Sequence, residues 1–468
     1  MYSFHNIIGG KALLSDTSFE VLNPSTLKTV GEAPAAKVSD LDEGVVAAQE
    51  AFSTWSTLPD AKRQDYCYKV AEILEAHQEE LARILTAEQG KPMGGMGSRF
   101  EISGAIEWTR YNAGLKIPVN VAQDNENGRI ELHHKPIGVV GSITPWNWPL
   151  MIAIWHIIPA IRAGNTVINK PSPLTPLSTL RMIALMNEVL PAGVVNSITG
   201  SDDIGVAMSS HSGIGKIVFT GSTQTGKKVM SSASETLKRL TLELGGNDAG
   251  IVLPDCNPAE IAAGLFWGAF INNGQTCAAL KRLYVHDRIY DQVCEELVKF
   301  ARTVKVGDGF EESSELGPIQ NRVQFDKLNN LVCESISRGG KVLLGGPVSE
   351  KTTLFFPVTL IATEAEDDPL IHEEQFGPAL PIIRYSALDK VMEHVNNNPN
   401  GLGGSIWTNN KVLFRELAAR MECGSVWCNK HGAIQPDIPF GGVKGSGIGV
   451  EFGQEGLLAN TNVQAIYF

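Results

Sequence analysis

The chain has 468 residues, which is long for a single hydrophobic core and favours two or three domains. Hydrophobic residues make up 43% of it and charged residues 19%, a composition that can bury large cores and argues against disorder. The 39 basic and 51 acidic residues leave a formal net charge of −12. This charge argues against nucleic acid or an anionic membrane as the partner.

Two features bear on the compartment. Residues 1–6 lack the basic start and long apolar stretch of a signal peptide, so none is expected. Residues 138–161 are apolar over a length that could span a membrane, but Pro145, Pro149 and Pro159 interrupt this stretch. We therefore expect a buried strand, a turn and a buried helix instead of a membrane-spanning helix. The spacing of the seven cysteines suits neither a disulfide framework nor a zinc site, which predicts a cytoplasmic protein without a metal centre.

Helical spacing dominates the first 110 residues, where apolar side chains recur with a helical period over 41–55 and 63–88. Residues 117–134 differ, because a polar break at 123–128 separates two extended segments. This pattern predicts two strands joined by a turn, forming an arm that projects from the body.

From residue 136 short apolar runs alternate with helical stretches, and the runs lie at 137–143, 166–169, 194–199 and 216–220. A continuous apolar run is typical of a parallel strand that is covered on both faces. The alternation therefore predicts βαβ units and a doubly wound sheet.

A second unit begins after residue 252, where Asn257, Pro258 and Glu260 form a helix start with Asn as the cap. The predicted helix, residues 261–270, leads to a glycine-containing loop that ends in Cys277. Strands and helices alternate from there to about residue 440, without an internal repeat.

Four segments each supply a part that covalent oxidation of a carbonyl needs: three contain Cys277, Glu243 and Asn147, and the fourth is residues 219–222. Cys277 lies in a loop after a helix, where a thiol can face a ligand. Glu243 stands in an apolar context before two glycines, and burial there raises the pKa of a carboxyl group and suits a general base. Asn147 follows a predicted strand, at the end where open α/β sheets bind ligands, and its amide can donate to an oxyanion. Taken singly, each segment is also compatible with a structural role: a buried thiol, a satisfied carboxylate and a rigid aromatic turn.

Two glycine-rich segments need separate treatment. Residues 219–222 (Phe-Thr-Gly-Ser) lie at a strand end before a helix, where free N–H groups can bind phosphate. Residues 221–228 nearly match a P-loop, but Lys228 stands where a Ser or Thr hydroxyl should bind Mg²⁺, so an NTPase is the weaker interpretation. Residues 445–453 have Gly-x-Gly spacing without a preceding βαβ strand, and are therefore not a dinucleotide fingerprint.

Together these segments resemble the aldehyde dehydrogenase superfamily, in the family's order and at about its spacing. The resemblance extends from Asn23-Pro24 through Glu88-Gln89-Gly90-Lys91-Pro92 to Pro439-Phe440-Gly441-Gly442. It implies an α/β fold of three parts: a Rossmann-like cofactor-binding domain (1–117 and 137–246), an α/β catalytic domain (247–444) and a β oligomerisation arm (118–136 and 445–468).

The resemblance also implies a reaction, the oxidation of an aldehyde to a carboxylic acid through a cysteine thioester. Cys277 would be the nucleophile and Glu243 the base for the hydrolytic water. The Asn147 side chain and the Cys277 backbone N–H would form the oxyanion hole. Relatives that transfer the acyl group to coenzyme A tend to lack this glutamate, so its presence favours release of the free acid.

The implied cofactor is NAD, and the departures from the family pattern make NADP possible as well. Pro173 occupies a position where the family often has a glutamate that repels a 2′-phosphate, and no added Arg or Lys replaces it. Residues 200–205 lack the second glycine of the family's loop, so its phosphate-binding residues are not transferred here. The resemblance assigns the cofactor to Lys170 (adenine ribose), Gly221 and Ser222 (pyrophosphate), Trp146, and Glu374 and Phe376 (nicotinamide ribose and ring).

The substrate tunnel implied by the resemblance is apolar, which favours an aliphatic or aromatic aldehyde over a charged one. Its expected residues are Trp148, Ile152, Trp155, Ile271 and Phe440, some of which could be core residues only. The arm near 118–136 would pair with the last strand, 462–468, and a partner subunit would cover its edges, giving a homodimer or homotetramer. Asn462 stands where many relatives have Glu, which could alter a subunit contact. Three alternatives stay open: a non-catalytic descendant of the fold, an NTPase, and a cofactor-independent esterase that uses the same cysteine.

Overall fold

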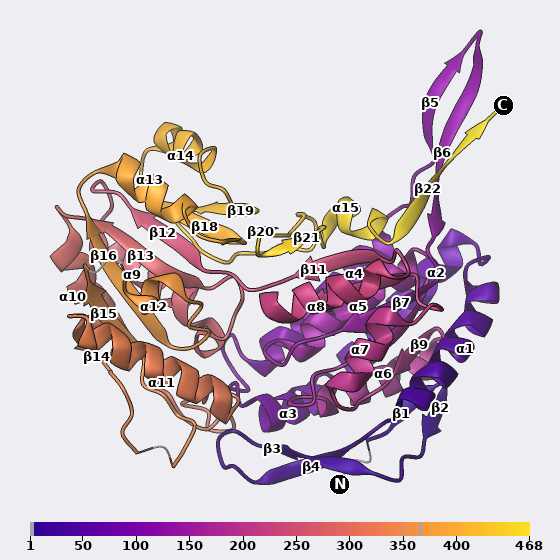
Figure 1. The fold of residues 1–468 in the computed structure, drawn as a ribbon, viewed down its shortest axis with the longest axis horizontal. Helices are drawn as coiled ribbons and strands as arrows, with labels where there is room; N and C mark the ends of the chain where they lie inside the picture. Colours follow the sequence, from indigo (N-terminus) through magenta and orange to yellow (C-terminus); the bar gives the residue numbers. More distant parts are fainter. Residues whose placement is uncertain (1–3, 351, 365–366) are drawn as a thin grey trace.

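The computed structural model describes residues 4–350, 352–364 and 367–468. The signal-peptide prediction concerns residues 1–6, and residues 1–3 of these lie outside the described residues. Two sheets with helices on both faces make up the body, and an antiparallel ribbon projects from one end (Figure 1). This arrangement confirms the predicted α/β class.

The first sheet contains six strands, parallel except for β21, which is antiparallel to β11. Their spatial order is β21 (Gly447–Ile448), β11 (Arg239–Glu243), β10 (Lys216–Thr220), β7 (Val139–Ile143), β8 (Thr166–Lys170) and β9 (Val195–Ser197). The four runs predicted between residues 137 and 220 are therefore β7 to β10, adjacent in one sheet.

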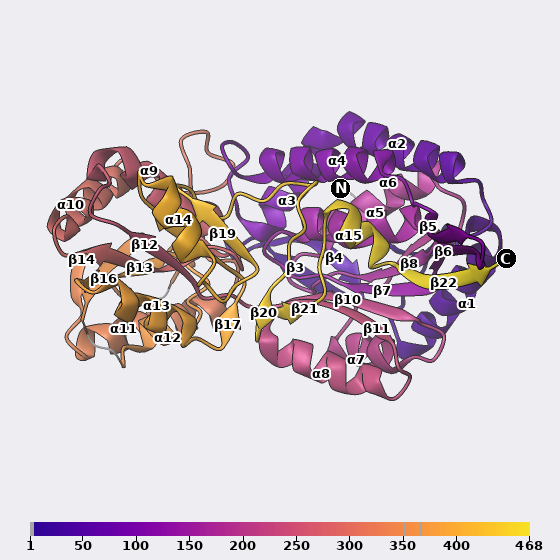
Figure 2. The ribbon, with the colours of Figure 1, turned by 90° about the horizontal axis from the view of Figure 1, so that it is seen from above.

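Helices cover both faces of this sheet, as Figure 2 shows from above. Val139 and Ile217 pack into one core cluster, whereas their neighbours Val140 and Val218 pack into another on the opposite face. Side chains alternate across a strand, so continuous apolar runs are needed to fill both layers. The helices of one layer are α1 (Val38–Trp55), α7 (Asp202–Ser210) and α8 (Thr223–Ser234); those of the other are α2 (Asp60–Ala76), α4 (Ser98–Gly114), α5 (Pro149–Arg162) and α6 (Leu177–Val189).

The prediction for the first 110 residues is only partly confirmed. The helical stretch at 63–88 is two helices, α2 and α3 (Gln78–Gln89), which are separated at His77. Two hairpins precede α1, and the sequence analysis missed them because their strands are short and half-exposed, without a sustained alternation. They are β1 (Asn6–Ile8) with β2 (Lys11–Leu13), and β3 (Ser18–Leu22) with β4 (Thr29–Pro34).

The proline-interrupted segment at 138–161 forms β7, a turn and α5, as predicted. Every residue of α5 is buried, which explains its apolar character without a bilayer. Within the described ranges, no helix has both the length and the apolar character that crossing a membrane would require.

The second sheet has seven strands, parallel except for β14, which is antiparallel to β15. Their spatial order is β14 (Lys341–Leu344), β15 (Thr359–Thr363), β16 (Ala379–Tyr385), β13 (Leu280–His286), β12 (Asp248–Val252), β18 (Gly403–Trp407) and β19 (Ser425–Cys428). The helices of this half are α9 (Pro258–Phe270), α10 (Tyr290–Ala301), α11 (Arg322–Ser337), α12 (Pro369–His372), α13 (Leu388–Asn396) and α14 (Lys411–Ala418).

Helix α9 begins as predicted. The Asn257 side chain caps it by accepting a hydrogen bond from Ala259 N at 3.1 Å, and Pro258 is its first residue. The chain then enters the short 3-10 helix η1 (Ile271–Gly274), which carries it to Cys277.

The projecting ribbon has three antiparallel strands in the order β22 (Thr461–Tyr467), β6 (Gly128–Pro136) and β5 (Asn120–Asn125), and the C-terminus lies along it (Figure 1). The expected pairing of the arm with the last strand is present within the chain, from Thr461 opposite Pro136 to Tyr467 opposite Ile130. Between the second sheet and the ribbon lie β20 (Val443–Lys444), which pairs with β17 (Asn400–Gly401), then β21 and α15 (Gly453–Leu458).

Candidate active site

A pocket of about 190 Å³ lies between the two halves, at the carboxyl ends of the strands of the first sheet. Its lining comes from widely separated segments: Pro145, Trp146, Asn147, Thr220, Gly221, Ser222, Leu244, Gly245, Cys277, Gln324, Lys327, Glu374 and Phe376. Seven of the nine predicted catalytic and cofactor residues are therefore brought together, and only Glu243 and Lys170 lie outside the lining. A larger hollow of about 600 Å³ beside β13, β16 and α13 contains none of them and offers no cysteine.

The loop before Cys277 has an unusual backbone. Asn272 (φ 51°), Asn273 (φ 57°) and Gly274 (φ 73°) are consecutive residues in the left-handed region, which asparagine tolerates better than most residues. A side chain at Gly274 would place its Cβ 2.3 Å from Gly377 O, so only glycine fits there. The resulting tight turn leaves Cys277 half-buried at the pocket wall. Such strain is often concentrated at functional sites.

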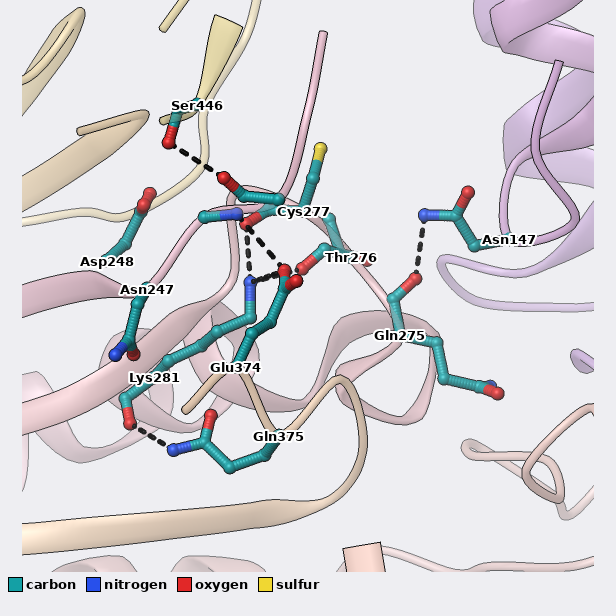
Figure 3. A network of polar contacts seen from close by, with 12 residues as sticks. Asn147, Asn247, Asp248, Gln275, Thr276, Cys277, Lys281, Glu374, Gln375 and Ser446 are labelled. Atoms are coloured by element: carbon teal, nitrogen blue, oxygen red, sulfur yellow. Dashed lines mark hydrogen bonds and ion pairs between the residues drawn. The ribbon is translucent and has the colours of Figure 1, made fainter. Parts of the chain in front are cut away.

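Asn147 is tied directly to this loop. Its side-chain Nδ2 donates to Gln275 O at 3.0 Å, as Figure 3 shows. Its backbone carbonyl oxygen accepts a hydrogen bond from Asn272 Nδ2 at 2.9 Å. An amide group has two N–H donors, so one remains for another acceptor. The predicted amide donor and the predicted nucleophile are thus held in one framework.

A buried ion pair supports the Asn147 turn from behind. Lys91 Nζ lies 2.5 Å from Glu101 Oε2 with both side chains fully buried, and it also donates to Asn147 O at 2.8 Å. Glu101 Oε1 accepts from Leu150 N (3.0 Å) and Met151 N (3.2 Å) in the first turn of α5. Burial lowers the pKa of Lys91 to about 8, although the negative charge of Glu101 acts to raise it. The sequence analysis noted the motif at residues 88–92 without assigning this role, because Glu101 gave no local signal.

Glu243 ends β11, beside but outside the pocket lining. Its carboxylate is buried, and neither oxygen has a hydrogen-bond partner among the described residues. Burial raises the pKa of Glu243 well above the usual value, and the negative charge of Glu451 raises it further. Glu451 Oε1 in turn lies 3.3 Å from His156 Nε2. Glu451 and His156 were not predicted from the sequence, because they are almost 300 residues apart in the chain.

The glycines near the C-terminus have a structural explanation. β21 pairs with β11 so closely that a Cβ at Gly447 would lie 2.0 Å from Leu242 O, and Gly447 has φ 150°. This close approach explains why glycine stands at position 447.

The surroundings of Cys277 disfavour its thiolate form. Burial raises the pKa of the Cys277 thiol to about 12, and the carboxylates of Glu243, Glu374 and Asp248 act in the same direction. Lys281, which the sequence analysis missed, acts in the opposite direction.

The expected pyrophosphate residues lie at a helix N-terminus. Ser222 is the N-cap of α8, and its Oγ accepts from Thr225 N at 3.2 Å. Gly221 and Ser222 both line the pocket, so the positive end of the helix lies beside it.

The expected nicotinamide residues form the opposite wall. The rings of Trp146 and Phe376 meet edge to face with their centroids 5.3 Å apart, and Phe376 has φ 48°, uncommon for a bulky residue. Two side chains of α11 hold this turn, since Gln324 donates to Gln375 O at 2.7 Å and Lys327 donates to Glu374 O at 2.9 Å.

Lys170 lies at the carboxyl end of β8, next to β7, and is not part of the pocket lining. Burial lowers the pKa of Lys170, while the charge of Asp202 raises it. The carboxylate of Asp202 therefore lies close enough to Lys170 to influence its charge.

The expected tunnel residues all belong to one hydrophobic cluster that also contacts Cys277. Trp148, Ile152, Trp155 and Phe440 are buried and Ile271 is half-buried. These five residues are all described, and none of them lines the 190 Å³ pocket. Trp148 is also bonded to the nucleophile loop, since its Nε1 donates to Thr276 Oγ1 at 3.0 Å.

Comparisons with known proteins agree with this geometry. The family model described as aldehyde dehydrogenase family matches residues 13–466. Phenylacetaldehyde dehydrogenase of Pseudomonas fluorescens is 35% identical, over 98% of this chain and 95% of the relative. Two solved structures superimpose with TM-scores of 0.96. The NAD⁺ complex of an aldehyde dehydrogenase from Bacillus cereus is 34% identical and covers 100% of this chain and 96% of its own. An NADP-dependent enzyme of E. coli is 29% identical and covers 99% of this chain and 98% of its own. The chain therefore belongs to the aldehyde dehydrogenase family, as an NAD(P)-dependent enzyme that oxidises aldehydes to carboxylic acids.

Proposed function

We propose that Cys277 is the nucleophile, that Asn147 with the Cys277 N–H is the oxyanion donor, and that Glu243 is the general base. The observation that carries this assignment is the meeting of Cys277 and Asn147 in one pocket, with an unpartnered buried carboxylate at its edge. Each group alone has a structural interpretation, but packing does not explain why Cys277 and Asn147 share one cavity with Glu243 beside it.

The reaction begins when Cys277 Sγ forms a bond to the aldehyde carbon and loses its proton. The carbonyl oxygen becomes an oxyanion, which the second N–H of Asn147 Nδ2 and the Cys277 backbone N–H stabilise. A bound nicotinamide supplies the oxidation by accepting hydride. Glu243 then takes a proton from a water molecule that attacks the Cys277 thioester, and the acid leaves as the thiol is restored.

A dinucleotide fits the residues around the pocket. The N-terminus of α8 at Gly221 and Ser222 provides N–H groups for the pyrophosphate. Glu374 offers a carboxylate for the nicotinamide ribose hydroxyls, and Trp146 and Phe376 offer apolar ring surfaces. Lys170 would donate to the adenine ribose hydroxyls. We propose NAD as the preferred cofactor, with NADP accepted.

The substrate is proposed to be an uncharged aliphatic or aromatic aldehyde, which would enter through Trp148, Ile152, Trp155, Ile271 and Phe440. The support is that these side chains belong to, or pack against, the hydrophobic cluster that also contacts Cys277. Apolar tunnels discriminate chain length weakly, at about 1–3 kcal/mol per methylene, so a range of aldehydes is expected.

The subunits are proposed to associate as a homodimer or homotetramer through the ribbon β5-β6-β22. Val121, Val463 and Tyr467 on these strands are 47%, 62% and 74% exposed, and exposed apolar edges favour pairing with another chain.

We also propose that the chain divides into a cofactor-binding, a catalytic and an oligomerisation part. A nucleophilic thiol among seven free cysteines suits a reducing compartment, and we propose the cytoplasm.

The test follows absorbance of the reduced nicotinamide with purified protein and an aldehyde panel from acetaldehyde to decanal, plus benzaldehyde and phenylacetaldehyde. NAD and NADP are compared, with Cys277→Ala as the control. Cofactor reduction with formation of one acid per turnover is expected, and it should vanish in the control. Hydrolysis of an activated ester without cofactor, with no aldehyde oxidation, would instead favour the esterase. If folded protein reduces neither cofactor with any aldehyde, the assignment is wrong.

A further inference from the structure

The ammonium group of Lys281 is bound on three sides beneath the nucleophile. Lys281 lies on β13, and its side chain is only 3% exposed. Its Nζ donates to Thr276 O at 2.8 Å and to Cys277 O at 2.5 Å, and it lies 3.2 Å from Glu374 Oε1 (Figure 3). An ammonium has three N–H donors, so each one has an oxygen acceptor and the group is held in place.

The contact with Thr276 O fixes the orientation of the peptide that carries the Cys277 N–H, and the contact with Cys277 O holds the following peptide. The described residues contain no cis peptide, so the N–H of Cys277 points away from the Thr276 carbonyl of the same peptide unit. Because Lys281 binds that carbonyl, the N–H is directed to the side of the peptide away from Lys281. The orientation of this proposed oxyanion donor therefore depends on Lys281.

The charge of Lys281 opposes the other charged groups around the thiol. Glu243 from β11, Asp248 from β12 and Glu374 from the turn before β16 all disfavour the thiolate, and Lys281 from β13 favours it. In a buried site such charges are weakly screened. Lys327 also lines the pocket, but it is exposed and binds only the backbone oxygen of Glu374 among the contacts described.

Glu374 is held against the same ammonium. Its Oε1 also accepts from Gly246 N at 3.1 Å. A Cβ at Gly245 would lie 2.5 Å from Oε2, so the lack of a side chain at Gly245 allows the carboxylate to approach. Glu374 therefore offsets part of the charge of Lys281 while leaving its two backbone contacts intact.

We propose that Lys281 is a positioning residue for Cys277, which orients the nucleophile's peptide and favours its thiolate, and that Glu374 limits this effect as its counter-charge. This inference rests on the proposed function, in which Cys277 is the nucleophile. It also links the nucleophile to the carboxylate proposed to bind the nicotinamide ribose.

The experiment measures alkylation of Cys277 by iodoacetamide between pH 6 and 10 on the full chain without cofactor, with each cysteine quantified by peptide mass spectrometry. Lys281→Met should slow the reaction at pH 7.5 about tenfold or more and move its pH profile upward, because a neighbouring cation shifts a pKa by about 1–3 units. Lys281→Arg should restore most of the rate. Glu374→Gln should act in the opposite direction and accelerate alkylation several-fold.

Two controls make the result specific. Lys299→Met removes an exposed lysine of α10, outside the pocket, and should leave the Cys277 profile unchanged. Cys333 is exposed and provides an internal standard, whose rate should be equal in all variants. If Lys281→Met does not fold, Glu374→Gln still decides the question through its opposite sign.

A Cys277 profile that is the same within twofold in wild type, Lys281→Met and Glu374→Gln would overturn the proposal. This outcome is distinct from failure of the proposed function, which would appear as wild-type protein that reduces no cofactor with any aldehyde.

Discussion

The buried pair Lys91–Glu101 allows a strong test of how the Asn147 turn is stabilised. Lys91→Met replaces the ammonium by an apolar group of similar length and leaves the Glu101 carboxylate fully buried. Glu101 would retain only its two bonds from Leu150 N and Met151 N, and Asn147 O would lose the contact with Nζ. The substitution therefore removes the counter-charge without creating a large cavity.

The magnitude follows from burial. Both side chains are fully buried, and Nζ and Oε2 are 2.5 Å apart, so the remaining charge cannot be solvated by water. Removing one partner of such a pair typically costs about 3–5 kcal/mol. The surface pair Lys299–Glu296 has side chains 76% and 30% exposed, and Lys299→Met should cost about 1 kcal/mol or less. The double variant Lys91→Met/Glu101→Gln should recover part of the loss, because no buried charge remains.

The assay is urea unfolding followed by circular dichroism, with all variants measured at one protein concentration because the protein is proposed to be an oligomer. Activity is measured in parallel, and kcat of Lys91→Met should fall more than KM rises, since the Asn147 turn loses support. A loss of free energy of unfolding as small as that of Lys299→Met would refute the reasoning. It would mean that the buried Glu101 carboxylate does not need Lys91 as its partner.

Three further predictions concern the oxyanion donor, cofactor choice and pH. Asn147→Ala should lower kcat about 10²–10³-fold, which is the usual effect of losing one oxyanion donor, while the alkylation rate of Cys277 changes only a few-fold. A decrease in kcat of less than tenfold would contradict the assigned role. Asp202→Asn should raise kcat/KM for NADP several-fold and leave that for NAD nearly unchanged, because a negative charge near Lys170 is removed; an unchanged ratio of the two values would exclude Asp202 from cofactor choice. Burial raises the pKa of Glu88 to about 7, so the folded state binds more protons than the unfolded state between pH 4.5 and 7, and stability from this group falls as pH rises through that window. Glu88→Gln should remove this pH dependence, which amounts to up to about 3 kcal/mol in the free energy of unfolding, in thermal unfolding measured from pH 4.5 to 8. An equal pH dependence in both proteins would show that Glu88 is ionised throughout.

Local signals in the sequence were sufficient where one element is determined by its own residues. The apolar runs of β7 to β10 predicted a parallel sheet because strands covered on both faces must be apolar on both sides. The cap at Asn257 predicted the start of α9 because the capping contact spans only two residues. The family motifs indicated Cys277, Asn147 and the cofactor residues, because each is embedded in a short characteristic segment.

Tertiary structure alone decided which groups surround these residues. Glu374 meets Lys281 across 93 positions, and Glu451 meets His156 across 295, and no sequence period encodes contacts at such separations. Gly447 similarly became interpretable only when β21 was seen to pair with β11. The sequence by itself thus determined the α/β class and indicated the chemical groups that are proposed for the reaction. Their ionisation and orientation were decided by the packing of the two halves, because a pKa depends on burial and on charges that only the folded chain brings together.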